Sequence, residues 1–368
     1  MKNVRLSVIL TSFNNASDIA NVLNSLDLQD FKDFELILID DASSDETVKV
    51  ALDILKKSNI NHHIYVNKIH KGFSASRNYG ISIAKGDYII FVEPDSLLNL
   101  NYISSLLFPF LASSLDFDSV MLKGLKLDDK NGFIGFSADS YDDIRDFARK
   151  NNRIINSSDL IKFILNMDIP FCFNLLIYKK EIILKNNIFF DEDLDYNEGF
   201  DFAVRYLSLS SNVLFVNKYS YYKNVKDKRA YLKSLLESFL HIKSLQSLAL
   251  YFNELHLEEN PFYLLDEKIK TYTIPKFVMK KINSLIDYDY PKDEIKGLVD
   301  ELALSNHLKI FKLQSKADYK LKLMIDLCLT NFNLYYSFRK RLHNSEDKAY
   351  EESIKISEDE SLKKLFDL

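Results

Sequence analysis

Short apolar runs alternate with segments of helical spacing through the first 95 residues, and this alternation constrains the fold more than any other feature. Runs rich in β-branched and aromatic residues predict strands, and runs that are apolar almost throughout predict strands buried on both faces. The four predicted strands are "VRLSVILTSF" (4–13), "FELILID" (34–40), "HHIYVN" (62–67) and "DYIIFVE" (87–93).

Three segments between these runs have the spacing of amphipathic helices. Residues 17–29 place apolar side chains on one helical face, residues 44–58 begin with acids that suit a helix N-terminus, and residues 72–86 end at a glycine. Buried strands that alternate with helices form a mostly parallel sheet covered by helices. The sequence therefore predicts an α/β fold with a Rossmann-like, mostly parallel sheet.

Polar residues lie at or just after the ends of the predicted strands. They are Thr11, Asp40, Asp41, Glu93 and Asp95. Right-handed crossovers bring the carboxyl ends of parallel strands to one edge of the sheet, where ligands bind in open α/β folds. We therefore expect these side chains to lie near one another at a ligand-binding edge.

The second half of the chain has a different pattern. Strand and helix signals continue less regularly to about residue 225, and the polar segment 124–157 is expected to form an active-site loop. Beyond this point, apolar residues recur at helical spacing. The predicted domains are an α/β domain at 1–225 and an all-helical domain at 226–368.

The composition narrows the class of protein. The chain has 368 residues and a formal net charge of −5, so nothing indicates nucleic-acid binding. Its two cysteines, Cys172 and Cys328, have no paired spacing, which excludes a disulfide framework and a cysteine-based zinc site. No apolar run reaches the roughly 18 residues that span a bilayer. We expect a cytoplasmic protein.

Five motifs follow one another in a specific order and spacing. They are "SVILTSFNN", "FELILIDDASSDET", "KGFSASRNYGISIAKGDYIIFVEPD", "NLLIYKKEIILKNNIFFDE" and "EGFDFAVRY". On these motifs, residues 4–225 resemble the family 2 glycosyltransferases, inverting enzymes of the GT-A fold that use nucleotide-sugar donors. The resemblance implies a GT-A sheet, followed here by the helical C-terminal domain.

The resemblance assigns a nucleotide-sugar pocket to residues at the strand ends and in the third helix. Thr11 and Phe13 would contact the base, and Asp41 would accept a hydrogen bond from a base N–H. Arg77 would lie near the donor diphosphate or the base, because a guanidinium group matches phosphate oxygens. Turn capping by Asp41 and a surface ion pair of Arg77 are the structural alternatives. Asn78 is expected to hold the adjacent loop.

The family usually has an Asp-x-Asp motif after the fourth strand, whose acids hold a divalent ion on the diphosphate. This chain has Glu93-Pro94-Asp95-Ser96 instead. Asp95 matches the metal-ligand position, and Glu93 would reach the ribose or a metal-bound water. Mn²⁺ or Mg²⁺ suits such oxygen ligands. A purely structural acidic turn is the alternative.

The family places its catalytic base in a Glu-Asp pair that precedes an aromatic residue and an arginine. Alignment on Phe202 and Arg205 puts Glu198 and Gly199 at that pair, so a glycine stands where the aspartate is expected. Glu198 and Asp201 are three residues apart and would share a helical face. Glu198 is the preferred base and Asp201 the second candidate, with loss of the base as the structural alternative.

The resemblance implies an enzyme that moves a sugar from a nucleotide-diphosphate donor, with a UDP-sugar expected, to a hydroxyl on a glycan, glycoprotein or cell-wall polymer. The alternative is a degenerate GT-A domain that binds nucleotide-sugar and serves in assembly. A nucleotidyltransferase is disfavoured, because the glycine- and lysine-rich loop typical after the first strand is missing. The helical domain is interpreted as an acceptor-side or homo-oligomer domain, and peripheral membrane contact stays open.

Overall fold

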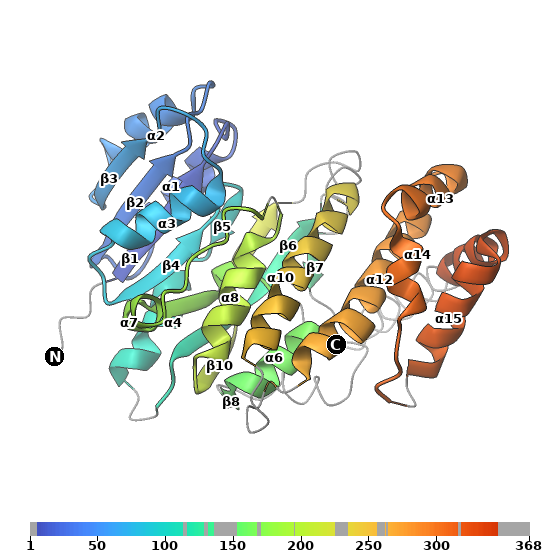
Figure 1. Cartoon of the computed structure of the whole chain (residues 1–368). Helices are drawn as coiled ribbons and strands as arrows, with labels where there is room; N and C mark the ends of the chain where they lie inside the picture. The colour runs from blue at the N-terminus through green and yellow to red at the C-terminus, as the bar shows by residue number, and fades with distance from the viewer. Residues whose placement is uncertain are drawn as a thin grey trace, which may run out of the picture. The chain divides into compact units, whose positions relative to one another are not determined.

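The computed structural model describes most of the chain, which divides into two compact units (Figure 1). The first unit is Met1–Tyr231 with Leu240–Asp266, and the second is Leu232–Phe239 with Glu267–Leu368. The described residues are 6–112, 116–128, 132–135, 153–167, 171–194, 196–224, 235–255, 262, 264–315 and 318–344.

The first unit is built on one mixed sheet, whose main path runs in the order β3-β2-β1-β4-β9-β6-β10-β5. Two further strands lie off this path, where β7 pairs with β6 and β8 pairs with β10. The strands are β1 (Leu6–Ser12), β2 (Phe34–Asp40), β3 (Asn61–Val66), β4 (Tyr88–Val92), β5 (Ser96–Leu98), β6 (Ser119–Asp128), β7 (Gly132–Gly135), β8 (Arg153–Asn156), β9 (Leu176–Lys179) and β10 (Asn212–Asn224).

The four predicted strands form the parallel part of this sheet. β1 pairs in parallel with β2 and β4, and β2 pairs in parallel with β3. β9 then lies antiparallel between β4 and β6, an inversion that the sequence did not predict. The mostly parallel α/β sheet is confirmed, and the carboxyl ends of β1, β2, β3 and β4 share one edge.

Helices cover both faces of the sheet. The first unit contains α1 (Ile19–Asp27), α2 (Thr47–Leu55), α3 (Phe73–Ile83), α4 (Tyr102–Ala112), α6 (Ser157–Leu165), α7 (Lys180–Lys185), α8 (Glu198–Ser208) and α10 (His241–Glu254), with a 3₁₀ turn at Phe173–Leu175. One face, which includes Val8, Leu36 and Ile90, packs with α1, α2 and α4 in a single apolar cluster. The alternate residues face the other way, where α3 packs on β1 and β2.

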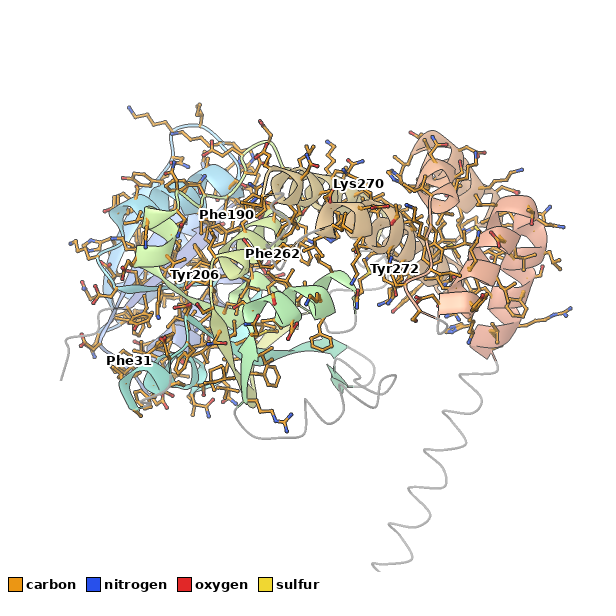
Figure 2. All side chains as sticks on the ribbon, turned by 60° about the horizontal axis from the view of Figure 1, so that its bottom comes forward. Phe31, Phe190, Tyr206, Phe262, Lys270 and Tyr272 are labelled. Atoms are coloured by element: carbon orange, nitrogen blue, oxygen red, sulfur yellow. The ribbon has the colours of Figure 1, made fainter. Side chains whose placement is uncertain are left out.

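An aromatic core lies on the α3 side of the sheet, beneath α8. Phe91 of β4 contacts Phe190 at 5.1 Å and Phe202 of α8 at 5.6 Å between ring centroids. Phe190 and Phe202 stack at 4.1 Å with an interplanar angle of 3°. Tyr206 extends this core along α8 (Figure 2). These fully buried rings fix α8 on the sheet, and so fix the direction of its first turn.

Helix α10 belongs to the first unit, although the sequence placed it in the C-terminal domain. The amide Nδ2 of Asn197, the residue before α8, lies 2.7 Å from His241 Nδ1 at the start of α10. Phe200 packs edge-on against His241 at 4.8 Å. The compact unit therefore extends past the predicted boundary at residue 225. The assignment of functional domains to 1–225 and 226–368 stays a prediction.

The second unit is helical, as its sequence periodicity predicts. The short α11 (Leu265–Lys268) spans the boundary between the two units in the sequence. The second unit then contains a π-helical turn at Ile269–Thr273, α12 (Ile274–Asp287), α13 (Lys292–Glu301), α14 (Leu304–Lys309), α15 (Tyr319–Thr330) and a helix over residues 332–344. Tyr272 stacks on Phe311 at 5.8 Å (Figure 2). None of the helices in the described part of the chain has the length and apolarity of a membrane span.

Candidate active site

Asp41 organises the loop that leads from β3 into α3. Its carboxylate is fully buried and accepts hydrogen bonds from Asn67 Nδ2 at 2.7 Å, from the Lys71 amide at 3.0 Å and from the Gly72 amide at 2.7 Å. Gly72 has φ of +93°, a conformation that side chains disfavour. Asp41, which follows β2, thus accepts hydrogen bonds from the loop between β3 and α3. Its predicted contact with the base stays a prediction.

His70 joins two residues that the sequence assigned to the nucleotide pocket. Its Nδ1 lies 2.9 Å from Asp41 Oδ2, and its ring centroid lies 4.1 Å from that of Phe13. Phe13 is partly exposed, whereas Thr11 at the end of β1 is only 2% exposed. Phe13 and His70 therefore form an accessible aromatic pair at the sheet edge, which His70 connects to the buried Asp41.

The turn after β1 is tied to the start of α2 by Asp45. Its Oδ2 accepts from the Ala16 amide at 3.1 Å, and its Oδ1 accepts from the Thr47 amide at 3.0 Å. Desolvation raises the pKa of Asp45, but the hydrogen bond from the Thr47 hydroxyl and these two backbone hydrogen bonds outweigh it and lower the pKa. Asp45 therefore has the structural role of a cap.

Arg77 lies inside the molecule, and aromatic rings surround its guanidinium group. The side chain is 5% exposed, and the guanidinium carbon lies 5.5 Å from the ring centroid of Phe73, 4.9 Å from Phe173 and 5.3 Å from Phe190. Each distance is within the range of a cation–π contact. The surface ion pair considered as an alternative for Arg77 is therefore wrong.

Two carboxylates meet the guanidinium group of Arg77. Its Nη1 donates to Glu198 Oε1, and its Nη2 lies 3.8 Å from Glu93 Oε1. Both acids are largely buried, with Glu198 15% and Glu93 21% exposed. Arg77 thus connects the end of β4 to the first residue of α8, Glu198, which lies 121 positions after Arg77 in the chain.

Glu93 and Asp95 lie on the turn between β4 and β5. The Ser96 amide donates to the Glu93 carbonyl at 3.2 Å, and β5 then pairs with β10. The oxygen donors of Glu93 and Asp95 fit a hard cation that takes its remaining ligands from a diphosphate and water. Within the described residues, no group of three or more His, Cys, Asp or Glu side chains is arranged to hold a metal. The predicted metal role of Asp95 stays a prediction.

Asp201 has different surroundings from Glu198. It is fully buried, and its two oxygens lie 2.7 Å from Arg205 Nε and 3.3 Å from Arg205 Nη2. Arg205 also donates to Ser247 Oγ at 2.8 Å and lies 4.8 Å from the Tyr251 ring centroid, both in α10. Desolvation raises the pKa of Asp201, and the charge of Arg205 opposes that rise. Asp201 therefore holds Arg205 in the contact between α8 and α10.

A phenylalanine ring fills the space beside Gly199. A Cβ atom at position 199 would lie 2.2 Å from Phe173 Cδ1, 2.5 Å from Cε1 and 2.7 Å from Cγ. Real Cβ contacts essentially never come below 3.0 Å. The glycine that stands at the expected aspartate position is therefore required by the Phe173 ring.

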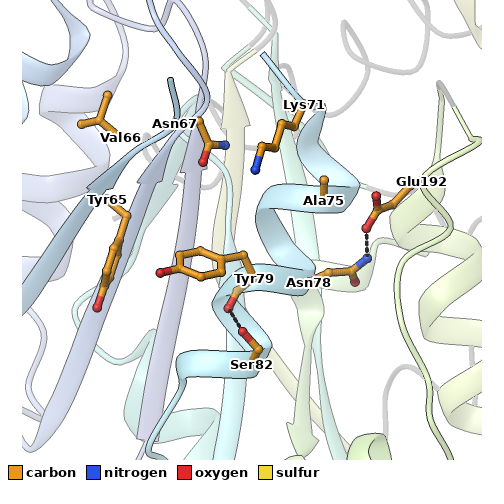
Figure 3. A pocket seen from close by; sticks show the side chains of 9 residues that line it. All are labelled: Tyr65, Val66, Asn67, Lys71, Ala75, Asn78, Tyr79, Ser82 and Glu192. Carbon is orange, nitrogen blue, oxygen red and sulfur yellow. Dashed lines mark hydrogen bonds between the residues drawn. The ribbon is translucent and has the colours of Figure 1, made fainter. Parts of the chain in front are cut away.

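Asn78 holds the segment that follows α7, which is distant in sequence, and not only a loop adjacent to it as expected from the sequence. Its Nδ2 donates to the Phe190 carbonyl at 2.9 Å and to Glu192 Oε1 at 3.0 Å, while its Oδ1 accepts from the Phe190 amide at 2.8 Å. Asn78 and Glu192 also line a groove of about 530 Å³ between β3 and α3 (Figure 3). The other lining residues are Tyr65, Val66, Asn67, Lys71, Ala75, Tyr79 and Ser82.

The structure brings the predicted site residues together in two groups. Phe13 and Asp41 meet through His70, and Arg77 joins Glu93 to Glu198. Asn67 was not predicted as a site residue, although it directly follows a strand, the signal used for Asp41. Phe173 was not predicted either, because it carries no local signal. Of the predicted active-site loop at 124–157, residues 129–131 and 136–152 lie outside the described residues. The described residues of this segment belong to β6, β7, β8 and the start of α6, so the expectation of a loop is wrong for them.

Comparison with known proteins tests the predicted family resemblance. Residues 7–172 match the family model described as "Glycosyl transferase family 2". This match confirms the predicted resemblance to the family over the N-terminal part of the chain. The chain is 24% identical over 313 residues to the uncharacterized glycosyltransferase EpsJ of Bacillus subtilis. This alignment covers 79% of the chain and 86% of EpsJ.

Two solved structures share the fold of this glycosyltransferase. The crystal structure of Staphylococcus aureus TarS 1-349 in complex with UDP-GlcNAc superposes with a TM-score of 0.65 at 17% identity, over 93% of this chain and 92% of that one. The mannosyltransferase PcManGT from Pyrobaculum calidifontis, in complex with GDP-Man and Mn²⁺, has a TM-score of 0.50 at 14% identity and covers 93% and 84%. The predicted GT-A-like fold is confirmed.

Proposed function

We propose that this glycosyltransferase moves a sugar from a UDP-sugar to a hydroxyl of a glycan, glycoprotein or cell-wall polymer, with inversion at the anomeric carbon. One observation carries the proposal: Arg77, Glu93 and Glu198, from three separate segments, meet at one corner of the sheet. TarS, a poly(ribitol-phosphate) beta-N-acetylglucosaminyltransferase seen with UDP-GlcNAc, supports a UDP-sugar donor and a polymer acceptor.

The donor nucleotide would lie along the edge formed by the ends of β1, β2 and β3. Phe13 offers a ring face for the base, next to Thr11 and to the loop that Asp41 holds. Parallel strands of an open sheet bind nucleotides at this edge. Arg77 lies between this edge and α8, where its charge favours a nearby diphosphate.

The transfer step needs a carboxylate at the acceptor side. The acceptor hydroxyl oxygen attacks the anomeric carbon, and a new C–O bond forms. The bond from that carbon to the diphosphate oxygen breaks and leaves its electron pair on the nucleoside diphosphate. Glu198 takes the hydroxyl proton, because it lies at the corner with Arg77 and Glu93 and its side chain is 15% exposed, whereas Asp201 is fully buried.

A divalent cation fits the corner between β4 and β5. Asp95 would hold Mn²⁺ or Mg²⁺, with Glu93 beside it, since both offer the oxygen ligands that these ions prefer. PcManGT, a structural neighbour, binds Mn²⁺ with GDP-Man. When bound, the ion supplies positive charge that stabilises the departing diphosphate.

A second candidate function has one observation in its favour. The Phe173 ring takes the space of a side chain at Gly199, the position of the family's usual base. On this alternative the chain binds a nucleotide-sugar without turnover and serves as an assembly subunit.

An assay of donor hydrolysis separates the two functions. The purified chain is incubated with UDP- and GDP-sugars and Mn²⁺, and released nucleotide is measured. We expect release from a UDP-sugar, a fall of about 100-fold in Asp95→Ala, and no fall in Asp53→Ala, an exposed acid on α2. Donor binding without turnover in any donor and acceptor mixture would instead support the assembly subunit.

A further inference from the structure

Phe173 and Gly199 form one steric unit. The three shortest contacts of a Cβ atom at position 199 are all to the Phe173 ring, including Cγ at 2.7 Å. Cγ is attached to the Phe173 Cβ, so a small rotation of the ring cannot relieve this contact. A side chain at 199 therefore requires that the Phe173 ring leave its place.

The surroundings of Phe173 prevent such a movement. Phe173 is 7% exposed, and its ring centroid lies 5.9 Å from those of Phe91 and Phe190. Its carbonyl accepts a hydrogen bond of 2.7 Å from the buried Tyr178 hydroxyl, which fixes the backbone of the 3₁₀ turn. Phe91 of the sheet and Phe190 of the segment after α7 pack against the ring, and the hydrogen bond from Tyr178 fixes the backbone that carries it.

The same ring is the nearest of the three that surround Arg77. The guanidinium carbon lies 4.9 Å from its centroid, closer than to Phe73 or Phe190. Arg77 in turn donates to Glu198, the residue before Gly199. Replacement of the Phe173 ring therefore changes both the space at 199 and the support of the Arg77–Glu198 pair.

We propose that an aromatic ring at 173 and an acidic side chain at 199 exclude each other, and that Phe173 is a positioning residue. It holds Arg77 against Glu198, so Glu198 is the carboxylate that takes the acceptor proton in the transfer step described above. The inference rests on the proposed function for its catalytic part and on packing alone for its steric part.

Thermal unfolding tests the steric part without any assay of activity. Gly199→Ala should lower the midpoint by roughly 5 °C, because overpacking costs more than the alanine gains in a helix. Gly297→Ala is the matched control, since it also lies in a helix and nothing lies within 4 Å of its added Cβ. The control should stay within about 1 °C or rise.

A double variant completes this test. In the Phe173→Ala background, Gly199→Ala should cost little, because the ring that it meets is gone. The two changes together should then lower the midpoint by less than the sum of the single changes. Equal effects of the two glycine substitutions, or strict additivity, would overturn the steric part.

Activity tests the catalytic part, with nucleotide release as the readout. Glu198→Gln should lower the rate by about 100-fold in the natural sequence. In the double variant Phe173→Ala/Gly199→Asp, the space left by the ring accommodates the introduced carboxylate. Glu198→Gln added to this double variant should then lower the rate by less than about 10-fold. Phe173→Leu should lower kcat by a larger factor than it raises the donor KM, because Phe173 acts on the transfer step through Glu198 as well as on the donor through Arg77.

The outcomes separate this inference from the proposed function. Equal losses on Glu198→Gln in both backgrounds, or no loss in the natural sequence, would overturn the catalytic part. If the natural sequence releases nucleotide from no donor, the proposed function fails and the catalytic part with it. The melting temperatures decide the steric part in either case.

Discussion

Helix α8 carries two acids one turn apart, and their surroundings are opposite. Glu198 begins the helix and pairs with Arg77 of another helix, at a corner that also includes Glu93. Asp201 is fully buried and pairs with Arg205 of its own helix. The pair that joins distant segments lies at the proposed site, whereas the pair within the helix holds the packing of α8. Neighbouring acids in a sequence can therefore differ entirely in role.

The largest effect on stability is expected when Arg77, the cation that pairs with Glu198, is replaced. Arg77→Met leaves Glu198 and Glu93 largely buried without a positive charge, and breaking such a pair costs about 3–5 kcal/mol. The free energy of unfolding in urea measures this loss. Lys49→Met breaks an exposed pair with Glu46 and should leave the free energy of unfolding nearly unchanged. Equal costs would show that the Arg77 pair is not buried in solution.

The second prediction concerns activity and compares the two acids directly. Glu198→Gln should lower kcat by about 100-fold or more, since it removes the proton acceptor and keeps the side-chain shape. Asp201→Asn should leave kcat within about 3-fold, because Asp201 is shielded by Arg205. Rates are measured on equal amounts of folded protein. A larger fall in Asp201→Asn would reverse the assignment of the base.

The third prediction concerns the stability of α8. Asp201→Asn removes the negative charge that faces Arg205 and leaves a neutral acceptor for its hydrogen bond, which should cost about 1–3 kcal/mol in the free energy of unfolding. Chemical denaturation measures this cost. Asp53→Asn, an exposed acid on α2, should change stability by less than about 0.5 kcal/mol. A neutral Asp201→Asn would show that the ion pair adds nothing to the packing.

The smallest effect is a difference in pH dependence. The folded pKa of Asp201 is raised by desolvation, so the pH-dependent part of its contribution to stability is fully present below the unfolded pKa near 4 and is lost as pH rises through the folded value. The stability of the natural sequence relative to Asp201→Asn should therefore fall between pH 4 and neutrality.

Asp45 gives the control of opposite sign for this measurement. Its pKa is lowered, so its contribution is present above the unfolded pKa and is lost as pH falls through the folded value. Relative to Asp45→Asn, the natural sequence should lose stability on acidification. Denaturation curves at several pH values measure both differences, and the same sign for both would contradict the assigned environments.

The parallel half of the fold could be predicted because its signals are local. Apolar runs at 34–40 and 87–93 became β2 and β4, since strands buried on both faces must be apolar along their length. The sheet edge that carries the candidate site could also be predicted, because the topology places the carboxyl ends of parallel strands together. The place and direction of β9 in the sheet could not be predicted in the same way, because an antiparallel strand between β4 and β6 depends on pairings far apart in the sequence.

By itself, the sequence determined the α/β sheet, the edge at which polar residues gather and the departure at Gly199. Only the tertiary structure decided what that departure means. Phe173 lies 26 positions before Gly199 in the sequence, yet its ring occupies the space of any side chain there. The tertiary structure also separated Glu198 from Asp201, because the partner of each acid is chosen by the direction in which α8 packs on the aromatic core. Such choices depend on contacts between distant segments, which no local pattern encodes.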